Sequence, residues 1–467
     1  AAALVVMMTV EALAATTPLS DQPILVANVP ANVMLALSVE FPTAITRAHQ
    51  GNTFDTSGST KYLGYFDPEK CYTYGASGYF TPSGSKTGAG YTCSGQWSGN
   101  FMNWATMQGI DTFRWVLTGG NRLIDEPLVF AGASGSPLGR TVLQRAYASG
   151  QASSNFPDRK LLQAAVGSYT GLGSAYVGGD VTIKNYNMGF QVRFSGKSST
   201  NKSSSVDLNV SVEVCRDDAT GRPLETNCVA YTQTVSDVTK TVYKPVGLMQ
   251  RYKDKMYFGA FGYLQLGTAN ATDGINGSGT VNKSKDGGVL RAPIQTIDNE
   301  ISETGAFNLD PYGLKDVSKK ITDSGSINYL NKFGTASKAY KHFDPVSEMY
   351  AEVIKYFKNL KPTASYLPPA SPDPVIYDGF PVFTTWEDPA KDAKWSDRGP
   401  LSCKRNYVIG IGDVNSNYDR NLSGGSSPVP ADVDFDMAGL TAKAWTDRVG
   451  ALEGMGALGG TTLQWGN

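Results

Sequence analysis

The chain has 467 residues, of which 41% are hydrophobic and only 18% are charged, against roughly 25% charged residues in an average soluble domain. Its 41 Lys and Arg residues balance 42 Asp and Glu residues to a net charge of −1, so we expect no binding to nucleic acid or anionic lipid through bulk charge. Two histidines, and five cysteines without a C-x-x-C motif, argue against a zinc cluster or an imidazole-based triad. The cysteine spacing favours an oxidising compartment.

The N-terminal residues are typical of the end of a secretory signal. Residues 1–15 contain a short apolar run followed by Ala12-Leu13-Ala14-Ala15, which offers a small-residue cleavage site. A short buried strand or helix is the alternative. Because no later run reaches the ~18 apolar residues of a membrane span, we predict an exported protein without a direct membrane span.

The first predicted strand lies within residues 24–50. Residues 33–37 are continuously apolar, which is typical of a strand buried on both faces of a parallel sheet, and a helix is predicted over residues 43–49. Residues 51–100 are rich in Gly, Ser, Thr and Tyr and contain Cys71 and Cys93. We predict that a disulfide between them closes a compact insert and adds about 3 kcal/mol. The aromatic residues of this insert form either a core or a contact surface.

Helical spacing of apolar residues begins at Phe101 and continues to Leu117, and Gly119-Gly120 ends this predicted helix. A second helix is predicted over residues 141–147. Alternating polar and apolar residues between positions 206 and 214 predict one strand. Beyond it, Cys215 and Cys228 flank a turn, and we predict a disulfide that joins its two arms.

The C-terminal part returns to an α/β pattern. Helices are predicted over residues 345–360 and 437–455, and a second buried parallel strand over residues 407–411. The two buried strands lie far apart in the sequence, which predicts an α/β domain interrupted by long insertions.

A set of short segments occurs in a fixed order along the chain. They are WSGNFMNWAT at 97–106, VEVC at 212–215 with NC at 227–228, YKPVGLMQRY at 243–252, KMYFG at 255–259, GGVLR at 287–291, DPVSEMY at 344–350 and CKRNYVI at 403–409. Together they resemble the PilY/PilC family of type IV pilus tip-associated proteins. The resemblance extends over most of the chain and implies a von Willebrand factor A-like, doubly wound α/β sheet with large inserts.

On this interpretation the A-like domain is formed by residues 24–50, 101–164 and 246–467. A cysteine-containing insert, 51–100, and a β-rich insert, 165–245, interrupt it. The resemblance also implies a C-terminal β-propeller, which these residues do not contain, so we expect the N-terminal region of a longer protein.

The resemblance implies a non-enzymatic role in type IV pilus biogenesis and tip-associated adhesion. The implied partners are minor pilins, the pilus tip and a receptor on a host or abiotic surface. The implied location is the periplasm, the outer surface or the pilus tip. Contact through loops and inserts on a rigid sheet is the expected mechanism.

The metal site of von Willebrand factor A-like domains has the motif Asp-x-Ser-x-Ser, a Thr before a helix and an Asp after a later strand. Ser38, Glu40 and Pro42 occupy the places of the first motif, while Asp344 replaces the Thr and Asp413 fits the last Asp. Because proline has no side-chain oxygen, we expect this site to be lost. Retention with altered ligands is the alternative.

A second candidate metal site is a loop with oxygen-bearing side chains at alternate positions, as at the start of Ca²⁺ loops. Its residues are Asp413, Asn415, Asn417 and Asp419. Tyr418 stands at the place of the loop glycine, and a polar turn after a strand is the favoured interpretation. Ca²⁺ is the cofactor that this set would take.

Two other functions remain open at this point. One is a metal-dependent adhesion module in which Asp344 and Asp413 still hold Ca²⁺ or Mg²⁺. The other is a secreted hydrolase, which requires two carboxylates about 5–10 Å apart in a cleft.

Overall fold

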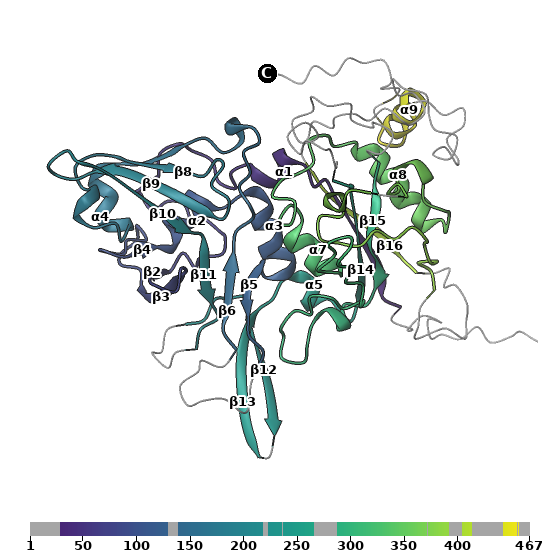
Figure 1. The fold of residues 1–467 in the computed structure, drawn as a ribbon, viewed down its shortest axis with the longest axis horizontal. Helices are drawn as coiled ribbons and strands as arrows, with labels where there is room; N and C mark the ends of the chain where they lie inside the picture. Colours follow the sequence, from purple (N-terminus) through teal and green to yellow (C-terminus); the bar gives the residue numbers. More distant parts are fainter. Residues whose placement is uncertain are drawn as a thin grey trace, which may run out of the picture.

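A computed structural model describes residues 29–128, 139–217, 223–235, 237–265, 287–370, 372–391, 404–412, 442–454 and 456 (Figure 1). The predicted signal segment, Cys403 and residues 413–419 lie outside the described residues. The described part is a mixed α/β structure with several sheets. Within it, no helix is long and apolar enough to cross a membrane.

The central sheet has the strand order β15-β14-β1-β16. Its strands are β1 (Ala31–Leu37), β14 (Met256–Gly262), β15 (Val289–Gln295) and β16 (Asn406–Ile411). β1 pairs in parallel with both β14 and β16, while β15 is antiparallel to β14. Met34 and Leu35 are fully buried, so side chains from both faces of β1 enter the core.

The two predicted buried strands do lie side by side, because Leu35 of β1 pairs with Ile409 of β16. The predicted burial of the second strand on both faces is wrong, however. Tyr407 and Ile409 are 47% and 40% exposed. The reason is that β16 is an edge strand, paired with β1 and with no other described strand.

Helices cover the central sheet (Figure 1). They are α1 (Phe41–Ile45), α5 (Leu248–Arg251), α7 (Ser326–Lys332) and α8 (Val346–Phe357), and α9 (Ala442–Leu452) follows near the C-terminus. α7 contacts β14 and β15, whereas α8 contacts β1 and β14. α8 and α9 fall within two predicted helices. α1 begins at Phe41, earlier than predicted, because Glu40 caps its N-terminus.

Two further sheets, together with the hairpin described below, form the insert, which lies between α1 and α5 in the sequence. The six-stranded sheet has the order β4 (Trp97–Ser98), β2 (Lys70–Tyr74), β3 (Phe80–Ser85), β11 (Ser211–Val214), β6 (Thr141–Gln144) and β5 (Arg122–Asp125). The other has the order β10 (Ser203–Asn209), β9 (Gln191–Lys197), β8 (Val181–Lys184) and β7 (Arg159–Leu161). Tyr65, Phe66, Tyr72 and Phe80 are at most 2% exposed, so much of the aromatic set between residues 51 and 100 forms a core.

Short helices connect these elements. They are α4 (Val166–Tyr169) and the 3₁₀ turns η1 (Ser153–Asn155), η2 (Gln163–Ala165), η3 (Ser174–Tyr176), η5 (Asp298–Glu300), η6 (Ala364–Tyr366) and η7 (Pro374–Tyr377). They are too short to be predicted by periodicity.

The helix predicted from Phe101 is two helices, α2 (Gly99–Thr106) and α3 (Gly109–Thr118). The break falls at Gln108, whose backbone is extended and whose N–H donates to the Asp111 carboxylate at 3.1 Å. Gly119 ends α3 in the left-handed conformation, as predicted.

Two other predictions of secondary structure are wrong. Residues 141–144 form strand β6 instead of a helix, because they pair antiparallel with β11 and β5. The strand predicted over residues 206–214 is divided between two sheets. The division falls at Val210, whose N–H donates to Phe190 O and whose carbonyl accepts from Arg145 N. Both differences come from strand pairing between residues distant in the sequence, which local periodicity does not report.

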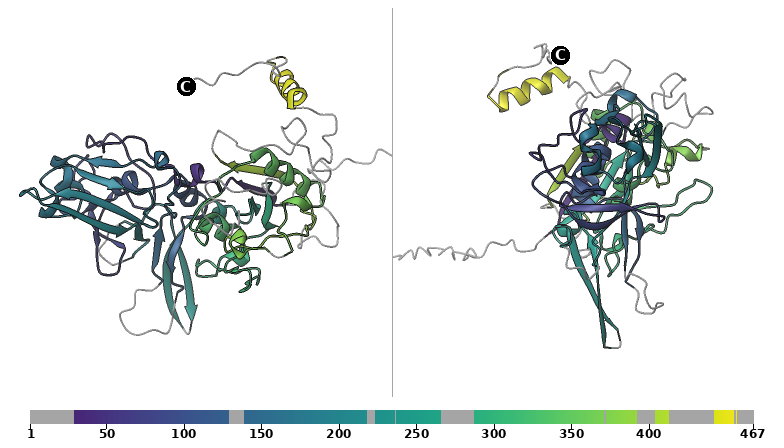
Figure 2. Two further views of the ribbon diagram at one scale, coloured as in Figure 1. Left: turned by 45° about the horizontal axis from the view of Figure 1, so that its top comes forward. Right: turned by 90° about the vertical axis from the view of Figure 1, so that its left-hand side faces the viewer.

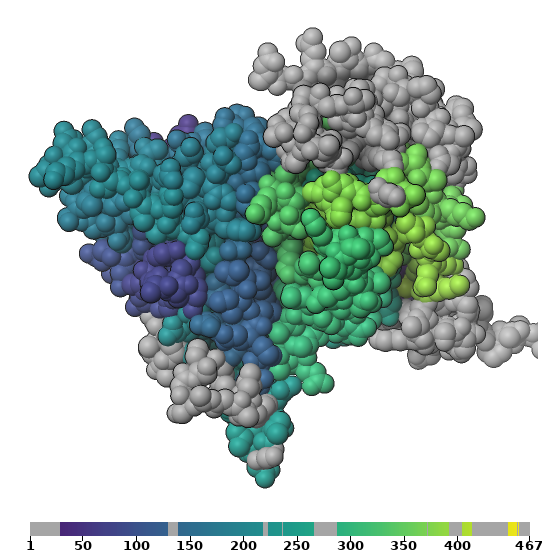
Figure 3. All heavy atoms as spheres, viewed as in Figure 1, coloured from purple at the N-terminus to yellow at the C-terminus, as the bar shows by residue number. Residues whose placement is uncertain are grey.

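A long hairpin, β12 (Cys228–Val235) and β13 (Val238–Pro245), projects from the body (Figures 1 and 2). Its distal end protrudes in the space-filling view as well (Figure 3). Disulfides join Cys71 to Cys93 and Cys215 to Cys228, which are the predicted pairs. The second disulfide ties the base of the hairpin to the residue that follows β11.

Candidate functional site

The first candidate site lies where the parallel strands of the central sheet end. Ser38, directly after β1, donates its N–H to Ile411 O of β16 at 2.8 Å. A Cβ on Gly412 would lie 3.1 Å from the Ser38 Cβ, so the ends of the two strands are in contact. In open α/β sheets, ligands bind outside the carboxyl ends of the strands, at the point where the strand order reverses.

The segment that leads to α8 joins this edge. Phe41 N donates to Lys341 O, and Lys341 N donates to Val39 O, each at 3.0 Å. This short parallel bridge places the residues just before Asp344 beside the end of β1. Glu40 and Asp344 are 1% and 4% exposed, so the edge holds buried acidic side chains.

Two of the predicted metal-site residues, Glu40 and Pro42, have structural roles in α1. Both carboxylate oxygens of Glu40 accept the N–H of Thr43, at 2.9 and 3.0 Å, and so cap α1. Pro42 lies in the first turn of α1 and accepts the N–H of Thr46 through its carbonyl. Ser38 differs, because its hydroxyl oxygen is buried without a hydrogen-bond partner in the described part of the chain. The structure thus brings Ser38 and Glu40 to one edge, and the metal site remains a prediction.

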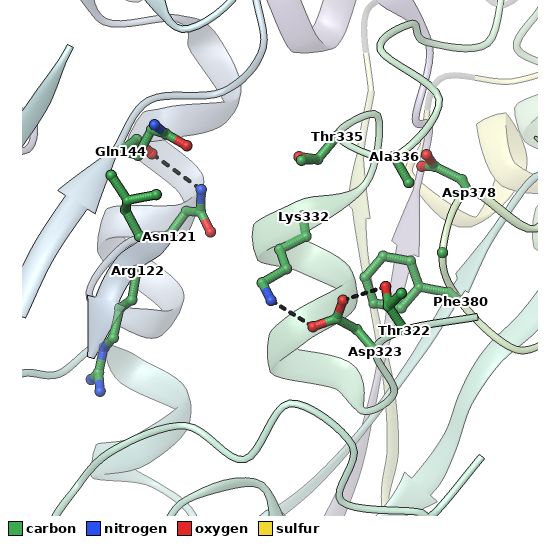
Figure 4. A pocket seen from close by; sticks show the side chains of 12 residues that line it. Asn121, Arg122, Gln144, Thr322, Asp323, Lys332, Thr335, Ala336, Asp378 and Phe380 are labelled. Carbon is green, nitrogen blue, oxygen red and sulfur yellow. Dashed lines mark hydrogen bonds and ion pairs between the residues drawn. The ribbon is translucent and has the colours of Figure 1, made fainter. Parts of the chain in front are cut away.

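A second candidate is a cleft of about 380 Å³ between the insert and the central domain (Figure 4). Asn121 and Gln144 line one wall, and residues near α7 line the other. On the second wall, Asp323 forms an ion pair with Lys332 at 2.5 Å.

The acids of this cleft are engaged in the fold. The Asp378 carboxylate accepts N–H groups of Gly334 and Ser337, at 2.5 and 2.9 Å. Burial raises the pKa of Asp378, and these hydrogen bonds partly offset that effect. Since Asp323 is ion-paired as well, the cleft offers mainly amide and hydroxyl groups to a ligand.

The base of the hairpin is a third polar cluster, which the sequence did not predict. The Lys244 ammonium is buried, and Asp125 Oδ1, Glu126 O, Gly139 O and Thr141 Oγ1 all lie 2.6 to 3.0 Å from its Nζ. Arg122 donates to Asp125 Oδ2 and to Pro245 O, both at 2.8 Å. The cluster fixes the hairpin to the edge of the six-stranded sheet.

The charges of this cluster compensate one another. Burial alone would raise the pKa of Asp125, but Arg122 and Lys244 together lower it below its ordinary value. Desolvation lowers the pKa of Lys244, and Asp125 opposes that shift. No local motif marks these residues, because they come from three separate strands. Lys244 and Pro245 lie in the segment YKPVGLMQRY at 243–252, one of those that resemble the family. That resemblance was the available sequence signal for this cluster.

The fold and these sites define a class: a disulfide-bonded, mixed α/β protein in which inserted sheets and a hairpin extend the surface of a mostly parallel sheet. Comparison with known proteins gives the family. Residues 52–206 match a family described as the PilY1 homolog small alpha/beta domain, and residues 277–462 match the PilY1 homolog second domain. The chain belongs to the PilY1 homolog family.

Two curated relatives are both called type IV pilus biogenesis factor PilY1 homolog and come from Xylella fastidiosa (strain Temecula1). The first is 33% identical over 457 residues, covering 86% of this chain and 33% of the relative. The second is 24% identical over 457 residues, covering 85% of this chain and 28% of the relative. The chain thus spans about a third of the length of these relatives. No solved structure matches it.

Proposed function

We propose that this chain is a region of a type IV pilus biogenesis protein that acts by protein–protein contact and not by catalysis. The observation that carries the proposal is the alignment with two type IV pilus biogenesis factors over 86% and 85% of the chain. The engaged acids of the cleft are consistent with a contact role. Minor pilins are the proposed partners in assembly, and a surface receptor is the proposed partner in adhesion.

The proposed framework is a von Willebrand factor A-like domain interrupted by inserts at 51–100 and 165–245. The order β15-β14-β1-β16, with β14 and β16 parallel to β1, supports this framework. Two disulfides are typical of proteins that fold in an oxidising compartment, so we place the protein in the periplasm or at the cell surface.

Deletion of the gene, followed by complementation, tests the assembly role. We expect the deletion strain to lose surface pili in electron micrographs, and the intact gene to restore them. Normal pili in the deletion strain would contradict a role in assembly. If those pili failed to support surface attachment, adhesion alone would describe the function.

A metal-dependent adhesion module is the second candidate. It is favoured by the buried Ser38 hydroxyl, which has no partner in the described part of the chain and lies at the carboxyl edge of β1. Serine hydroxyls and carboxylates are ligands of Ca²⁺ and Mg²⁺. Ser38, Asp344 and the predicted loop of Asp413, Asn415, Asn417 and Asp419 would hold the ion.

Calorimetry with Ca²⁺ and with Mg²⁺ tests this candidate. Binding should release or absorb heat, raise the melting temperature and weaken in Ser38→Ala. If neither Ca²⁺ nor Mg²⁺ gave heat or a thermal shift, metal dependence would be excluded. The assembly proposal would be unaffected.

A further inference from the structure

The cleft between the insert and the central domain has a fixed width. Thr118 Oγ1 of α3 donates to Asn331 Oδ1 of α7 at 2.8 Å, and Arg114 Nε donates to Leu330 O at 2.8 Å. Both donor side chains are fully buried, so opening the interface would leave polar groups unsatisfied. The cleft of about 380 Å³ is therefore preformed, and its volume lies in the range of small-molecule sites.

The insert wall of the cleft offers two amide oxygens that the fold does not use. Asn121 Nδ2 donates to Gln144 O, and Gln144 Nε2 donates to Ser211 Oγ, each at 3.3 Å, so both side chains are held in place. In the described part of the chain, Asn121 Oδ1 and Gln144 Oε1 have no hydrogen-bond partner. Each oxygen can still accept a hydrogen bond from a ligand.

The opposite wall offers donors and acceptors side by side. The Lys332 ammonium pairs with the Asp323 carboxylate at 2.5 Å, and Thr322 Oγ1 donates to the same carboxylate at 2.8 Å. An ammonium has three N–H groups, so Lys332 keeps two for a ligand. The Thr335 hydroxyl also lines the cleft and has no partner among the described residues. Figure 4 shows Lys332 and Thr335 extending from this wall toward the insert wall.

The charges around the cleft cancel. Its lining contains two cations, Arg122 and Lys332, and two carboxylates, Asp323 and Asp378. Lys332 and Asp323 pair with each other. Arg122 pairs with Asp125 at 2.8 Å, while Asp378 accepts two backbone N–H groups. A charged ligand would bring an uncompensated charge out of water, whereas a neutral ligand would not, so the lining favours a neutral ligand.

We propose that this cleft binds a neutral saccharide whose hydroxyl groups meet both walls. A hydroxyl donates one hydrogen bond and accepts two, so a single group can donate to Gln144 Oε1 or Asn121 Oδ1 and accept from Lys332. The C–H groups of a sugar ring are apolar, and the exposed residues Leu123 and Ala336 provide one apolar contact on each wall. This inference rests on the proposed function and names the chemical class of the surface receptor.

A peptide fits the same lining less well. Lys332 and Asp323 present N–H donors and carboxylate oxygens at one place, where one hydroxyl satisfies both. A peptide N–H or C=O satisfies only one of them. Peptides also gain specificity from pockets for their side chains, but Phe380 of the lining is only 2% exposed and gives a side chain little to pack against. The same lack of an exposed aromatic face leads us to expect a weak affinity, with a Kd on the order of 1 mM.

An array of immobilised saccharides, incubated with the full chain, tests the proposal. Its neutral members are oligosaccharides of glucose, galactose, mannose and N-acetylglucosamine. Sialylated and sulfated saccharides and uncharged peptides represent the competing classes. We expect at least one neutral saccharide to bind, and calorimetry then measures its Kd.

Two variants remove ligand contacts from opposite walls of the cleft. Gln144→Met keeps the length of the side chain but removes the amide, and Lys332→Met removes the ammonium. Gln163→Met and Lys253→Met are the matched controls outside the cleft, since they also lose one amide hydrogen bond and one ion pair. We expect the Kd to rise about tenfold in Lys332→Met and about threefold in Gln144→Met, and to stay unchanged in both controls. A thermal melt of each variant verifies that it is folded.

Three results would each overturn the proposal. One is that no neutral saccharide binds at concentrations up to about 10 mM. Another is a Kd that neither cleft variant raises above its control, which would assign binding to another surface. The third is an anionic saccharide or a peptide that binds better than every neutral saccharide and loses affinity in Lys332→Met. Pili counted in electron micrographs report on the assembly role separately, and a strain carrying Lys332→Met should keep them.

Discussion

The central sheet and the insert each have an apolar core, but among the described residues only the insert contains disulfides. Around β1 the core is made of apolar side chains such as Met34 and Leu35, and helices close it. In the insert, Arg145 is fully buried and donates to Thr106 O and Gly189 O at 3.2 Å, and also to Asn185 Oδ1 and Gln191 O. Apolar burial is non-directional, whereas each guanidinium bond needs one acceptor in one place.

The apolar core and the disulfides of the insert show how it can be carried without disturbing the sheet. The sheet also contains a buried arginine, Arg291 of β15, which donates to Tyr263 O and Tyr377 O. The insert joins loops by buried cations that bind main-chain carbonyls, and by disulfides. Substitutions in the two regions should therefore fail in different ways, and four predictions use that difference.

The largest expected effect is on the central sheet. Leu35→Ala removes a fully buried side chain from the middle of β1 and should lower the free energy of unfolding by ~2–5 kcal/mol in urea titrations. Ile409, the cross-strand neighbour of Leu35, lies on the exposed edge strand β16. Ile409→Ala should therefore lower the free energy of unfolding by only about 1 kcal/mol or less. Equal losses would mean that β16 is as buried as β1.

The disulfide of the insert comes next. Replacing Cys71 and Cys93 together by Ser releases a loop with a sequence separation of 22 residues and should cost about 3 kcal/mol. Hydrogen exchange should accelerate in β2 and β3 but not in β1. If β1 exchanged equally fast, the two regions would unfold as one unit and the comparison would fail.

Arg145 tests the directional contacts of the insert. Arg145→Met leaves buried carbonyl groups without a donor and should cost about 2 kcal/mol, measured by thermal or urea unfolding. Arg193→Met on β9 is the matched control. Arg193 is exposed and pairs with Asp207 across the strands, so its loss should destabilise the fold much less than Arg145→Met. A control as damaging as Arg145→Met would contradict the role given to buried arginines.

The smallest expected effect is a pH dependence at the base of the hairpin. Because the pKa of Asp125 is lowered in the folded state, its contribution to stability is present above the ordinary value of 3.8 and is lost as the pH falls toward the folded pKa. Asp125→Asn should be less stable than the unsubstituted chain at pH 7. Its stability should also fall less between pH 5 and pH 3.

Urea unfolding across that pH range measures the effect. The exposed carboxylate of Asp254 provides the control, and Asp254→Asn should keep the acid slope of the unsubstituted chain. An unchanged slope in Asp125→Asn would show that Arg122 and Lys244 do not act through this carboxylate.

Local patterns were sufficient for some elements. The apolar run at 33–37, the helix ending at Gly119 and α8 each follow from residues close together in the sequence. The pairing of the cysteines also agrees with their spacing, since each pair closes a short loop. The carboxyl edge with Ser38 and Glu40 could be placed because both residues directly follow a recognisable strand.

The remaining features depend on contacts between distant segments. Residues 141–144 became a strand because β11, about seventy positions later, supplied the pairing partner. The helical pattern is interrupted at Gln108 because the Asp111 carboxylate accepts two N–H groups. One is that of Gln108, and the other is that of the distant Ala146, at 2.8 Å. The exposure of β16 likewise depends on which strand lies beyond it.

By itself, the sequence determined the family, the disulfide pairs and the strands whose apolar residues are contiguous. The family was indicated by the ordered segments that resemble it, whereas the disulfide pairs and these strands follow from local spacing. Only the tertiary structure decided which strands share a sheet, where Lys244 and Arg145 find their acceptors and which side chains face each other across the cleft. Hydrogen bonds between distant strands decide these features, and their partners are chosen by the folded chain as a whole.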